Sequence, residues 1–288
     1  MNTKRSNYDV IVVGSGVAGL SYALDVAKTA SVCLMTKGEL SDTNTRWAQG
    51  GISAVLSAAD SFDEHVADTL HAGAGLCRDD VVRAVVEAGP RAITTLLERG
   101  VELDRDEGGK LMLTREGGHS QRRVAHYRDA TGAAIQRALV ARAREHSNID
   151  IVENHHAIDL ITRAKFARGH GQGRPGTKDD RVLGVYALDV RGEEVHAFGA
   201  SVVCLATGGA GRAYLYTSNP DVATGDGVAM AYRRGAHVAN MEFFQFHPTC
   251  LYIACAARVL ISEVVRGAGG LLVDKHGEPL GETKKIFF

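Results

Sequence analysis

The glycine-rich run Gly14-Ser15-Gly16-Val17-Ala18-Gly19 constrains the fold of this chain more than any other sequence feature. Before it, the β-branched residues 9–13 predict a short buried strand, and after it the apolar spacing of residues 20–29 predicts a helix. Residues 31–36 predict a second strand, which completes a strand–helix–strand unit. In such a unit the first glycine permits a tight turn, the second admits a pyrophosphate, and the third lets helix and strand pack closely. We therefore expect a dinucleotide diphosphate at the helix N-terminus, bound by Gly14, Ser15, Gly16, Val17, Ala18 and Gly19.

The residues after the second predicted strand leave the kind of dinucleotide open. NAD-binding folds place an acidic residue about 20 residues after the glycines, where it bonds the ribose hydroxyls. Here that strand ends in Met35-Thr36-Lys37, and Glu39 comes only later. This arrangement disfavours NAD, and the ammonium of Lys37 suits either a phosphate or a polarised flavin ring.

The rest of the chain alternates between helical and strand patterns, which predicts an α/β fold with a parallel sheet. Helices are expected at residues 61–72, 79–99 and 132–146, and strands at 149–153, 182–189 and 200–205. Residues 168–180 contain glycine, proline and charges without a period, which predicts an exposed hairpin loop. His155-His156 follows a predicted strand, and we expect this pair to lie in a loop.

Composition excludes several classes of protein. The chain has 288 residues, enough for one large or two ordinary domains, and its formal net charge of −1 disfavours nucleic acid and anionic membranes as partners. The pairs Arg122-Arg123 and Arg233-Arg234 are therefore expected to be surface charge. No apolar run approaches the roughly 18 residues of a membrane span, and the polar start has no signal-peptide core. The five cysteines form no Cys-x-x-Cys pair, and no histidine spacing predicts a metal site, so we expect a reduced, cytoplasmic protein without a bound metal.

Further motifs follow the glycine-rich run in a fixed order. They are Ser41-Asp42-Thr43-Asn44-Thr45-Arg46-Trp47-Ala48-Gln49-Gly50-Gly51, Arg115-Glu116-Gly117-Gly118-His119-Ser120, Asp129-Ala130-Thr131-Gly132, Ala206-Thr207-Gly208-Gly209-Ala210-Gly211, Thr224-Gly225-Asp226-Gly227, Phe244-Gln245-Phe246-His247-Pro248-Thr249 and Glu263-Val264-Val265-Arg266-Gly267. Together they resemble the succinate dehydrogenase/fumarate reductase flavoprotein family. The resemblance implies a Rossmann-like FAD-binding domain with a parallel sheet over residues 1–240, and the start of a truncated α+β capping domain at residues 241–288.

The resemblance also implies how FAD is held. Residues 15–18 would lie on the FAD diphosphate, with Lys37 nearby, and Thr207, Gly208 and Asp226 would complete the pocket. Asn44 stands where membrane-bound relatives carry the histidine that links their flavin covalently, so a non-covalent FAD is expected. The isoalloxazine would be wrapped by Asn44, Thr45, Arg46, Trp47, Ala48, Gln49, Gly50 and Gly51.

Glu116 indicates the substrate, since the dehydrogenases of the family usually carry an apolar residue at this place. A carboxylate here could pair with the α-ammonium of an amino acid, which succinate lacks. The chain thus resembles the soluble branch that oxidises L-aspartate to iminoaspartate with O2, giving H2O2, or with fumarate as acceptor. That reaction is the first step of de novo NAD biosynthesis, which implies quinolinate synthase as a pathway partner. The implied catalytic residues are Glu116, His247 as a carboxylate ligand, Ser262 and Glu263 near the substrate, and Arg266 paired with Glu263.

The family pattern continues beyond the last residue of this chain. A catalytic arginine, a second histidine and a second arginine for the substrate, and the last strand of the FAD-domain sheet are expected to be missing. Loss of one preorganised charged donor costs about 3 kcal/mol, so loss of several predicts negligible turnover. Two other interpretations remain, a soluble fumarate reductase or succinate-oxidising flavoprotein, and a non-catalytic FAD-binding remnant. His247 alone also fits a core histidine, and Glu116 also fits a surface salt-bridge cluster with Arg115, Arg122 and Arg123.

Overall fold

The structure, a computed structural model, describes residues 6–166, 180–247, 250–251, 259–261, 265 and 270–279. The chain divides into two compact units. The first unit comprises Met1–Arg46 and Gln136–Phe244, and the second comprises Trp47–Ile135 and Gln245–Phe288. The expected domain boundary at residue 240 stays a prediction.

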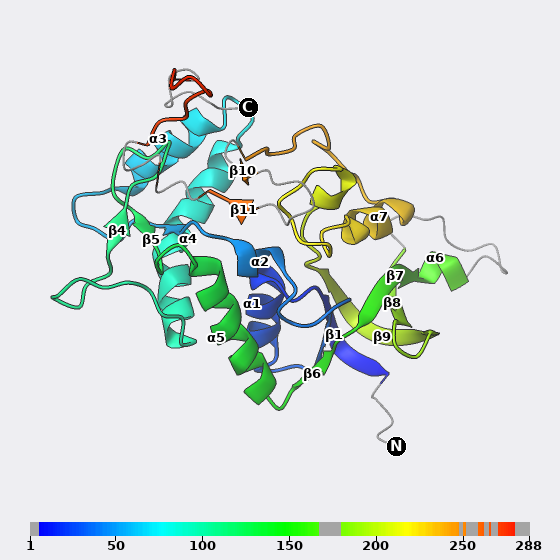
Figure 1. Ribbon diagram of the computed structural model, residues 1–288. Coiled ribbons are helices and arrows are strands. Elements are labelled where there is room, and N and C mark those ends of the chain that lie inside the picture. Colours follow the sequence, from blue (N-terminus) through cyan, green and yellow to red (C-terminus); the bar gives the residue numbers. More distant parts are fainter. Residues whose placement is uncertain are drawn as a thin grey trace. The chain divides into compact units, whose positions relative to one another are not determined.

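A six-stranded sheet in the order β6-β2-β1-β9-β8-β7 forms the centre of the first unit (Figure 1). Strands β6, β2, β1 and β9 are parallel, which confirms the α/β class with a parallel sheet. Strand β8 pairs antiparallel with both β9 and β7. Only four residues join β8 to β9, which suits an antiparallel hairpin, since a parallel crossover needs a dozen or more. The bounds are β1 Asn7–Val13, β2 Val32–Met35, β6 Ile149–Val152, β7 His155–Thr162, β8 Val182–Asp189 and β9 Glu194–Leu205.

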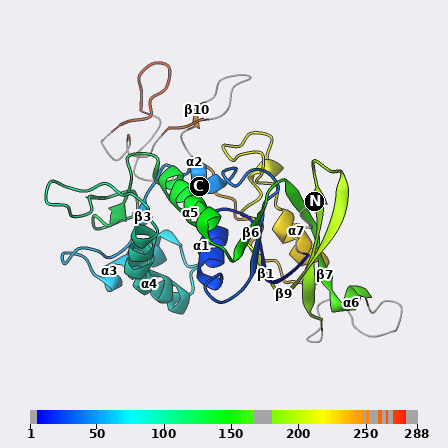
Figure 2. The same cartoon turned by 90° about the horizontal axis from the view of Figure 1, so that it is seen from below.

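Helices cover both faces of the parallel strands. Helices α1 (Val17–Val26) and α5 (Thr131–Glu145) lie side by side on one face, and α7 (Asp226–Arg233) lies on the other (Figure 2). All four residues of β2 are buried, as expected for a strand covered on both sides. On the α7 face, Met230 joins a hydrophobic cluster with Ile11 and other strand residues. This core holds the carboxyl ends of the parallel strands in place.

The second unit contains two packed helices and a small antiparallel sheet in the order β3-β5-β4. Helix α3 begins after Ser61, whose hydroxyl accepts the Glu64 N–H at 3.2 Å, a capping arrangement that explains why the helix starts there. The bounds are α3 Phe62–Ala72, α4 Asp79–Glu98, β3 Ile52–Ser53, β4 Leu113–Thr114, β5 Val124–Ala125, β10 Cys250–Leu251 and β11 Val259–Leu260. The shorter helical elements are α2 Asn44–Trp47, α6 Arg163–Phe166 and the 3-10 turn η2 Gly211–Ala213.

Most of the predicted elements are confirmed to within one or a few residues. The exceptions are β9, which begins six residues earlier than expected, and the pair His155-His156, which lies in β7. The loop prediction for this pair was wrong because β7 gains its hydrogen bonds from β8, a partner that a local pattern does not reveal. The predicted hairpin loop at residues 168–180 lies outside the described residues, apart from Asp180.

The prediction that both arginine pairs are surface charge was wrong for two of the four side chains. The Arg123 side chain is fully buried against Asp60 and Asp68, and Arg234 is hydrogen-bonded to Asp159. A carboxylate from a distant segment compensates the buried guanidinium of Arg123 and the half-buried one of Arg234, so the local sequence cannot predict their burial. Among the described cysteines, Cys33, Cys77, Cys204 and Cys250 form no disulfide, and Cys255 lies outside the described residues. Of the helices described, none combines the length and apolar character needed to cross a membrane.

Candidate functional site

A cleft of about 620 Å³ opens in the first unit at the carboxyl ends of β1, β2 and β9. Strand β1 lies between β2 and β9, so the chain leaves β1 where the strand order reverses. Open α/β sheets bind ligands at such a point, and cofactor pockets measure about 300–1,000 Å³. The cleft therefore has the place and the size of a dinucleotide site.

The predicted glycine turn forms one wall of this cleft. Gly14 has φ +113°, and a Cβ there would lie 2.2 Å from the Ala206 carbonyl oxygen at the end of β9. A Cβ on Gly19 would lie 1.9 Å from the Gly14 carbonyl oxygen, so the third glycine serves the contact of α1 with the turn. Helix α1 begins after Gly16, which offers no side-chain cap. A helix N-terminus whose cap residue has no side chain is typical of sites that bind an external anion.

Gln136 on α5 ties the segments around the glycine turn together. Its Nε2 donates to the Ser15 carbonyl at 2.9 Å and to the Leu40 carbonyl at 2.7 Å, and its Oε1 accepts from the Thr43 hydroxyl at 3.1 Å. In the same region, the Thr45 hydroxyl accepts the Val17 N–H at 3.0 Å. Sequence reasoning missed Gln136, although a polar residue at helical spacing from apolar positions such as 139 and 143 was a usable signal.

Lys37 meets a carboxylate in the cleft. Its Nζ lies 2.6 Å from Asp226 Oδ2, the Thr224 hydroxyl donates to Asp226 Oδ1 at 2.8 Å, and His156 Nε2 lies 3.4 Å from Oδ2. Burial raises the pKa of the Asp226 carboxyl, but the hydrogen bonds from Lys37 and Thr224 and the neighbouring positive charges outweigh it and hold that pKa below its usual value. Asp226 is therefore ionised at neutral pH.

Most of the predicted cofactor residues line the cleft of the first unit, and others belong to the second unit. Those that line the cleft are Gly14, Ser15, Gly16, Val17, Ala18, Lys37, Asn44, Thr45, Thr207, Gly208 and Asp226. Gly19 lies in the turn contact described above, and Arg46 belongs to the first unit without lining the cleft. The second unit contains Trp47, Ala48, Gln49, Gly50 and Gly51. The predicted cofactor residues did not include the lining residues Thr36, Asp42, Thr43, His155, His156 and His237, although Thr36 and Thr43 directly adjoin predicted ones.

Glu116 lies in the second unit beside the run predicted to wrap the flavin. A Cβ on Gly50 would lie 3.7 Å from Glu116 Oε1 and 3.8 Å from Oε2, so the half-buried carboxylate faces this glycine. Arg123 pairs with Asp60 and Asp68, which contradicts a salt-bridge cluster that includes Arg123. Within the part of the chain that the structure describes, Glu116 forms no ion pair.

The other predicted catalytic residues fall late in the chain. His247 belongs to the second unit and is half-buried. Gln49 of the same unit donates to the Leu260 carbonyl at 3.2 Å, two residues before the predicted substrate residues begin. Ser262, Glu263 and Arg266 lie outside the described residues.

Comparison with known proteins agrees with this geometry. The family described as FAD binding domain matches residues 9–285, nearly the whole chain. The chain belongs to this family. Proteins named L-aspartate oxidase are similar to it, with 52% identity over 272 residues for the one from Acinetobacter baylyi and 46% over 281 residues for the chloroplastic one from Arabidopsis thaliana. These alignments cover 94% of this chain in both cases, but 49% and 42% of the relatives, so the chain spans about half the length of the curated relatives it matches.

Solved structures of related flavoproteins have the same fold. An E. coli quinol fumarate reductase structure aligns with a TM-score of 0.84 and 32% identity, covering 94% of this chain and 44% of that one. A flavocytochrome c3 fumarate reductase in its open conformation aligns with a TM-score of 0.76 and 28% identity, covering 96% of this chain and 48% of that one.

The residues of the cleft fit FAD, the cofactor of this FAD binding domain family. A Cβ on Gly16 would lie 3.3 Å from Thr45 Oγ1, a tight contact, so a glycine suits this position at the start of α1. Gly208 has φ +72° and faces the cleft with only the Asn44 amide nitrogen within 4 Å of a Cβ position, at 3.9 Å. Glycine at position 16 keeps side-chain bulk away from a diphosphate at the first turn, and a ring near Asn44 would find uncrowded backbone at Gly208. FAD, when bound, supplies a two-electron acceptor, which the side chains of this chain do not provide.

Proposed function

We propose that this chain is the cofactor- and substrate-holding portion of an FAD-dependent L-aspartate oxidase, with FAD bound non-covalently. The overall conversion takes L-aspartate to iminoaspartate: the α-carbon loses its hydrogen with both bonding electrons, the amine loses a proton, and a C=N bond forms. The acceptor is O2, which becomes H2O2, or fumarate, which becomes succinate. By the same proposal the protein is cytoplasmic, and its product passes to quinolinate synthase in NAD biosynthesis.

The observation that carries the substrate assignment is the Glu116 carboxylate beside Gly50. A carboxylate in this position can accept hydrogen bonds from the α-ammonium of an amino acid, and charge-assisted hydrogen bonds of this kind are about twice as strong as neutral ones. Among the described residues no cation competes for it in an ion pair. The names of the relatives support the same substrate, since they are L-aspartate oxidases at 44–54% identity.

The chain's own residues divide the work of binding. In the first unit, the glycine turn and the N-terminus of α1 hold the diphosphate, and Asn44, which lines the same cleft and cannot form the covalent flavin link, is proposed to face the ring. In the second unit, Glu116 orients the substrate ammonium, and His247 is proposed to bind a substrate carboxylate. Holding both ends of the substrate fixes the reacting carbon in one geometry, which is how orientation lowers a barrier.

The test is a comparison of two substrates on the FAD-loaded chain without oxygen. We expect bleaching of the flavin absorbance near its visible maximum with L-aspartate and none with succinate, and peroxide once air is admitted. If turnover is negligible, perturbation of the flavin spectrum by L-aspartate at lower concentration than by succinate gives the same answer. Reduction or tighter binding by succinate would refute the substrate assignment.

A soluble fumarate reductase or succinate-oxidising flavoprotein is the second candidate, favoured by the fold match to the E. coli quinol fumarate reductase. The variant Glu116→Leu separates the two, since it restores the apolar residue usual in the dehydrogenases. For an L-aspartate oxidase this change weakens L-aspartate binding and spares succinate. For a fumarate reductase it leaves both unchanged. Failure of the soluble chain to take up FAD at all would refute both, and the non-catalytic FAD-binding remnant as well.

A further inference from the structure

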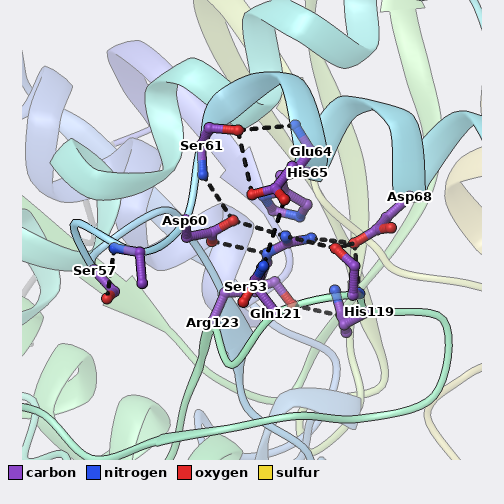
Figure 3. Close-up of polar contacts among 12 residues, drawn as sticks. Ser53, Ser57, Asp60, Ser61, Glu64, His65, Asp68, His119, Gln121 and Arg123 are labelled. Atoms are coloured by element: carbon purple, nitrogen blue, oxygen red, sulfur yellow. Dashed lines mark hydrogen bonds and ion pairs between the residues drawn. The ribbon is translucent and has the colours of Figure 1, made fainter.

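A buried ion network lies beneath the loop that carries Glu116. The guanidinium of Arg123 donates to both carboxylate oxygens of Asp60, at 2.9 and 2.8 Å, and to Asp68 Oδ2 at 2.5 Å (Figure 3). The side chains of Arg123 and Asp60 are 0% and 1% exposed. Asp60 directly precedes the Ser61 cap of α3, and Asp68 lies on that helix. The network therefore connects the start of β5 to α3 inside the second unit.

Such a network is a poor source of stability, because desolvation of buried charges offsets most of their attraction. The network instead fixes the orientation of its members, since a bidentate guanidinium–carboxylate pair holds both partners in one plane. The backbone of Arg123 adds a second constraint, because its carbonyl accepts the Ala54 N–H at 3.0 Å beside the β3–β5 pairing. Arg123 thus holds the strand that continues the Trp47–Gly51 segment.

The same network holds the end of the Arg115–Ser120 loop. The Ser120 N–H and hydroxyl both donate to Asp68 Oδ2 at 2.8 Å. His119 Nε2 lies 3.2 Å from the Ser53 hydroxyl on β3, and the His119 N–H donates to the Glu116 carbonyl at 3.3 Å. The loop is therefore attached to β3 through His119 and to α3 through Ser120. These attachments lie three and four residues after Glu116 and leave its carboxylate facing Gly50.

Burial and the nearby Arg123 lower the pKa of both His119 and His65, whose rings meet edge to face at 5.8 Å. Asp60, Asp68 and Glu116 act in the opposite direction on His119, and the balance leaves its pKa lowered. A neutral His119 matters for the neighbouring carboxylate. An imidazolium there would be a fixed cation competing with a substrate ammonium for Glu116.

We propose that Arg123, Asp68 and His119 are positioning residues that aim Glu116 at the substrate ammonium and so set the preference for an amino dicarboxylate over a plain dicarboxylate. This inference rests on the proposed function. None of the three touches the substrate. Each acts through the loop that carries Glu116.

The test measures the dissociation constants of L-aspartate and succinate from the flavin spectrum of the FAD-loaded chain without oxygen. We expect Asp68→Asn to lower the preference for L-aspartate about tenfold, while succinate binding and FAD affinity change by less than twofold. Asp63→Asn is the matched control, because Asp63 lies on the same helix and pairs with Arg83 on the surface. It should leave the preference unchanged.

A second pair of variants keeps the test decisive if Asp68→Asn does not fold. His119→Leu removes the contact with Ser53 and should lower the preference, whereas His119→Gln retains a polar partner for that hydroxyl and should restore most of it. The positioning role alone is overturned if folded Asp68→Asn keeps the preference for L-aspartate. If Asp68→Asn does not fold, the same result in His119→Leu overturns it. An unaltered chain that shows no preference for L-aspartate instead overturns the proposed substrate, and the positioning role with it.

Discussion

The substitution Gln136→Met tests whether one buried amide holds the cofactor cleft together. Methionine has nearly the same length and shape, so packing is retained while three hydrogen bonds are lost. The carbonyls of Ser15 and Leu40 then lose the amide donor, and the hydroxyl of Thr43 loses the acceptor of its own hydrogen. Gln136 is only 2% exposed, so water does not replace the amide without rearrangement.

The magnitude follows from the number of bonds lost. A typical intramolecular hydrogen bond contributes about 1 kcal/mol net, so three of them amount to about 3 kcal/mol of unfolding free energy. With urea m-values of about 1–3 kcal/mol/M, the midpoint falls by about 1 M or more at an unchanged slope. FAD affinity falls as well, because the apparent dissociation constant rises in inverse proportion to the fraction of molecules with an ordered cleft. We expect that rise to be about tenfold.

The assay is urea unfolding followed by circular dichroism, together with a flavin fluorescence titration for FAD. Gln121→Met is the matched control, since Gln121 makes one exposed hydrogen bond of 3.4 Å to Glu64. Its effect should stay within about 0.5 kcal/mol, the usual range for surface substitutions. If Gln136→Met unfolds at the same urea concentration as Gln121→Met and binds FAD as the unaltered chain does, the Gln136 amide does not hold the cofactor cleft together.

Three further predictions concern the turn, the cleft and the histidine pair. Gly14→Ala should abolish FAD binding in a titration, because φ +113° and the close carbonyl leave no room for a methyl group. Lys37→Met should move acid unfolding, followed by circular dichroism, to higher pH. The lowered pKa of Asp226 stabilises the fold above pH 3.8, its ordinary pKa, and this stability is lost as the pH falls through the pKa of the folded state. Removal of the Lys37 ammonium raises that folded-state pKa, so the loss begins at higher pH. The lowered pKa values of His65 and His119 should make the unfolding free energy fall as pH drops below the ordinary 6.5, and a double His→Gln variant should show a flatter profile.

Each of these has a control variant in the same chain. Gly117→Ala should leave FAD affinity unchanged, since a Cβ there meets nothing within 4 Å. Lys28→Met removes an exposed pair with Asp25 and should leave acid unfolding where it was. His71→Gln changes an exposed histidine on α3 and should keep the slope below pH 6.5. A control that behaves like its partner variant contradicts the corresponding argument.

The part of the fold that could be predicted is the part encoded in local patterns. The glycine turn, α1 and the strands around it follow from spacing within about 30 residues, and the capping pair Ser61 and Glu64 explains the start of α3. Strand β7 was missed because His155, His156 and Asp159 interrupt the apolar alternation, while the hydrogen bonds that hold it come from β8. Local patterns indicate elements, but they do not say which distant partner completes them.

The candidate site divides in the same way. The glycines and the Thr45–Gly51 run were recognisable as motifs, whereas Gln136, Arg123 and the Lys37–Asp226 pair depend on contacts between residues 55 to 189 positions apart. Arg123 is the clearest case, since its neighbour Arg122 is exposed and nothing local distinguishes the two. Only the tertiary fold brings the carboxylates of Asp60 and Asp68 to the buried Arg123.

The charges of the cleft explain why backbone geometry, more than side-chain charge, must hold the cofactor. Of the described residues that line it, Lys37 is the only lysine or arginine, and Asp226 already neutralises it at 2.6 Å, while Asp42 adds a further carboxylate. Among these described lining residues, a diphosphate therefore finds no lysine or arginine without a carboxylate partner. The α1 N-terminus, worth about half a unit charge, supplies positive potential there together with the amides of the glycine turn. A glycine turn that admits close approach is therefore a condition for binding FAD in this protein, because the lysine that the structure describes in the cleft is already paired with Asp226.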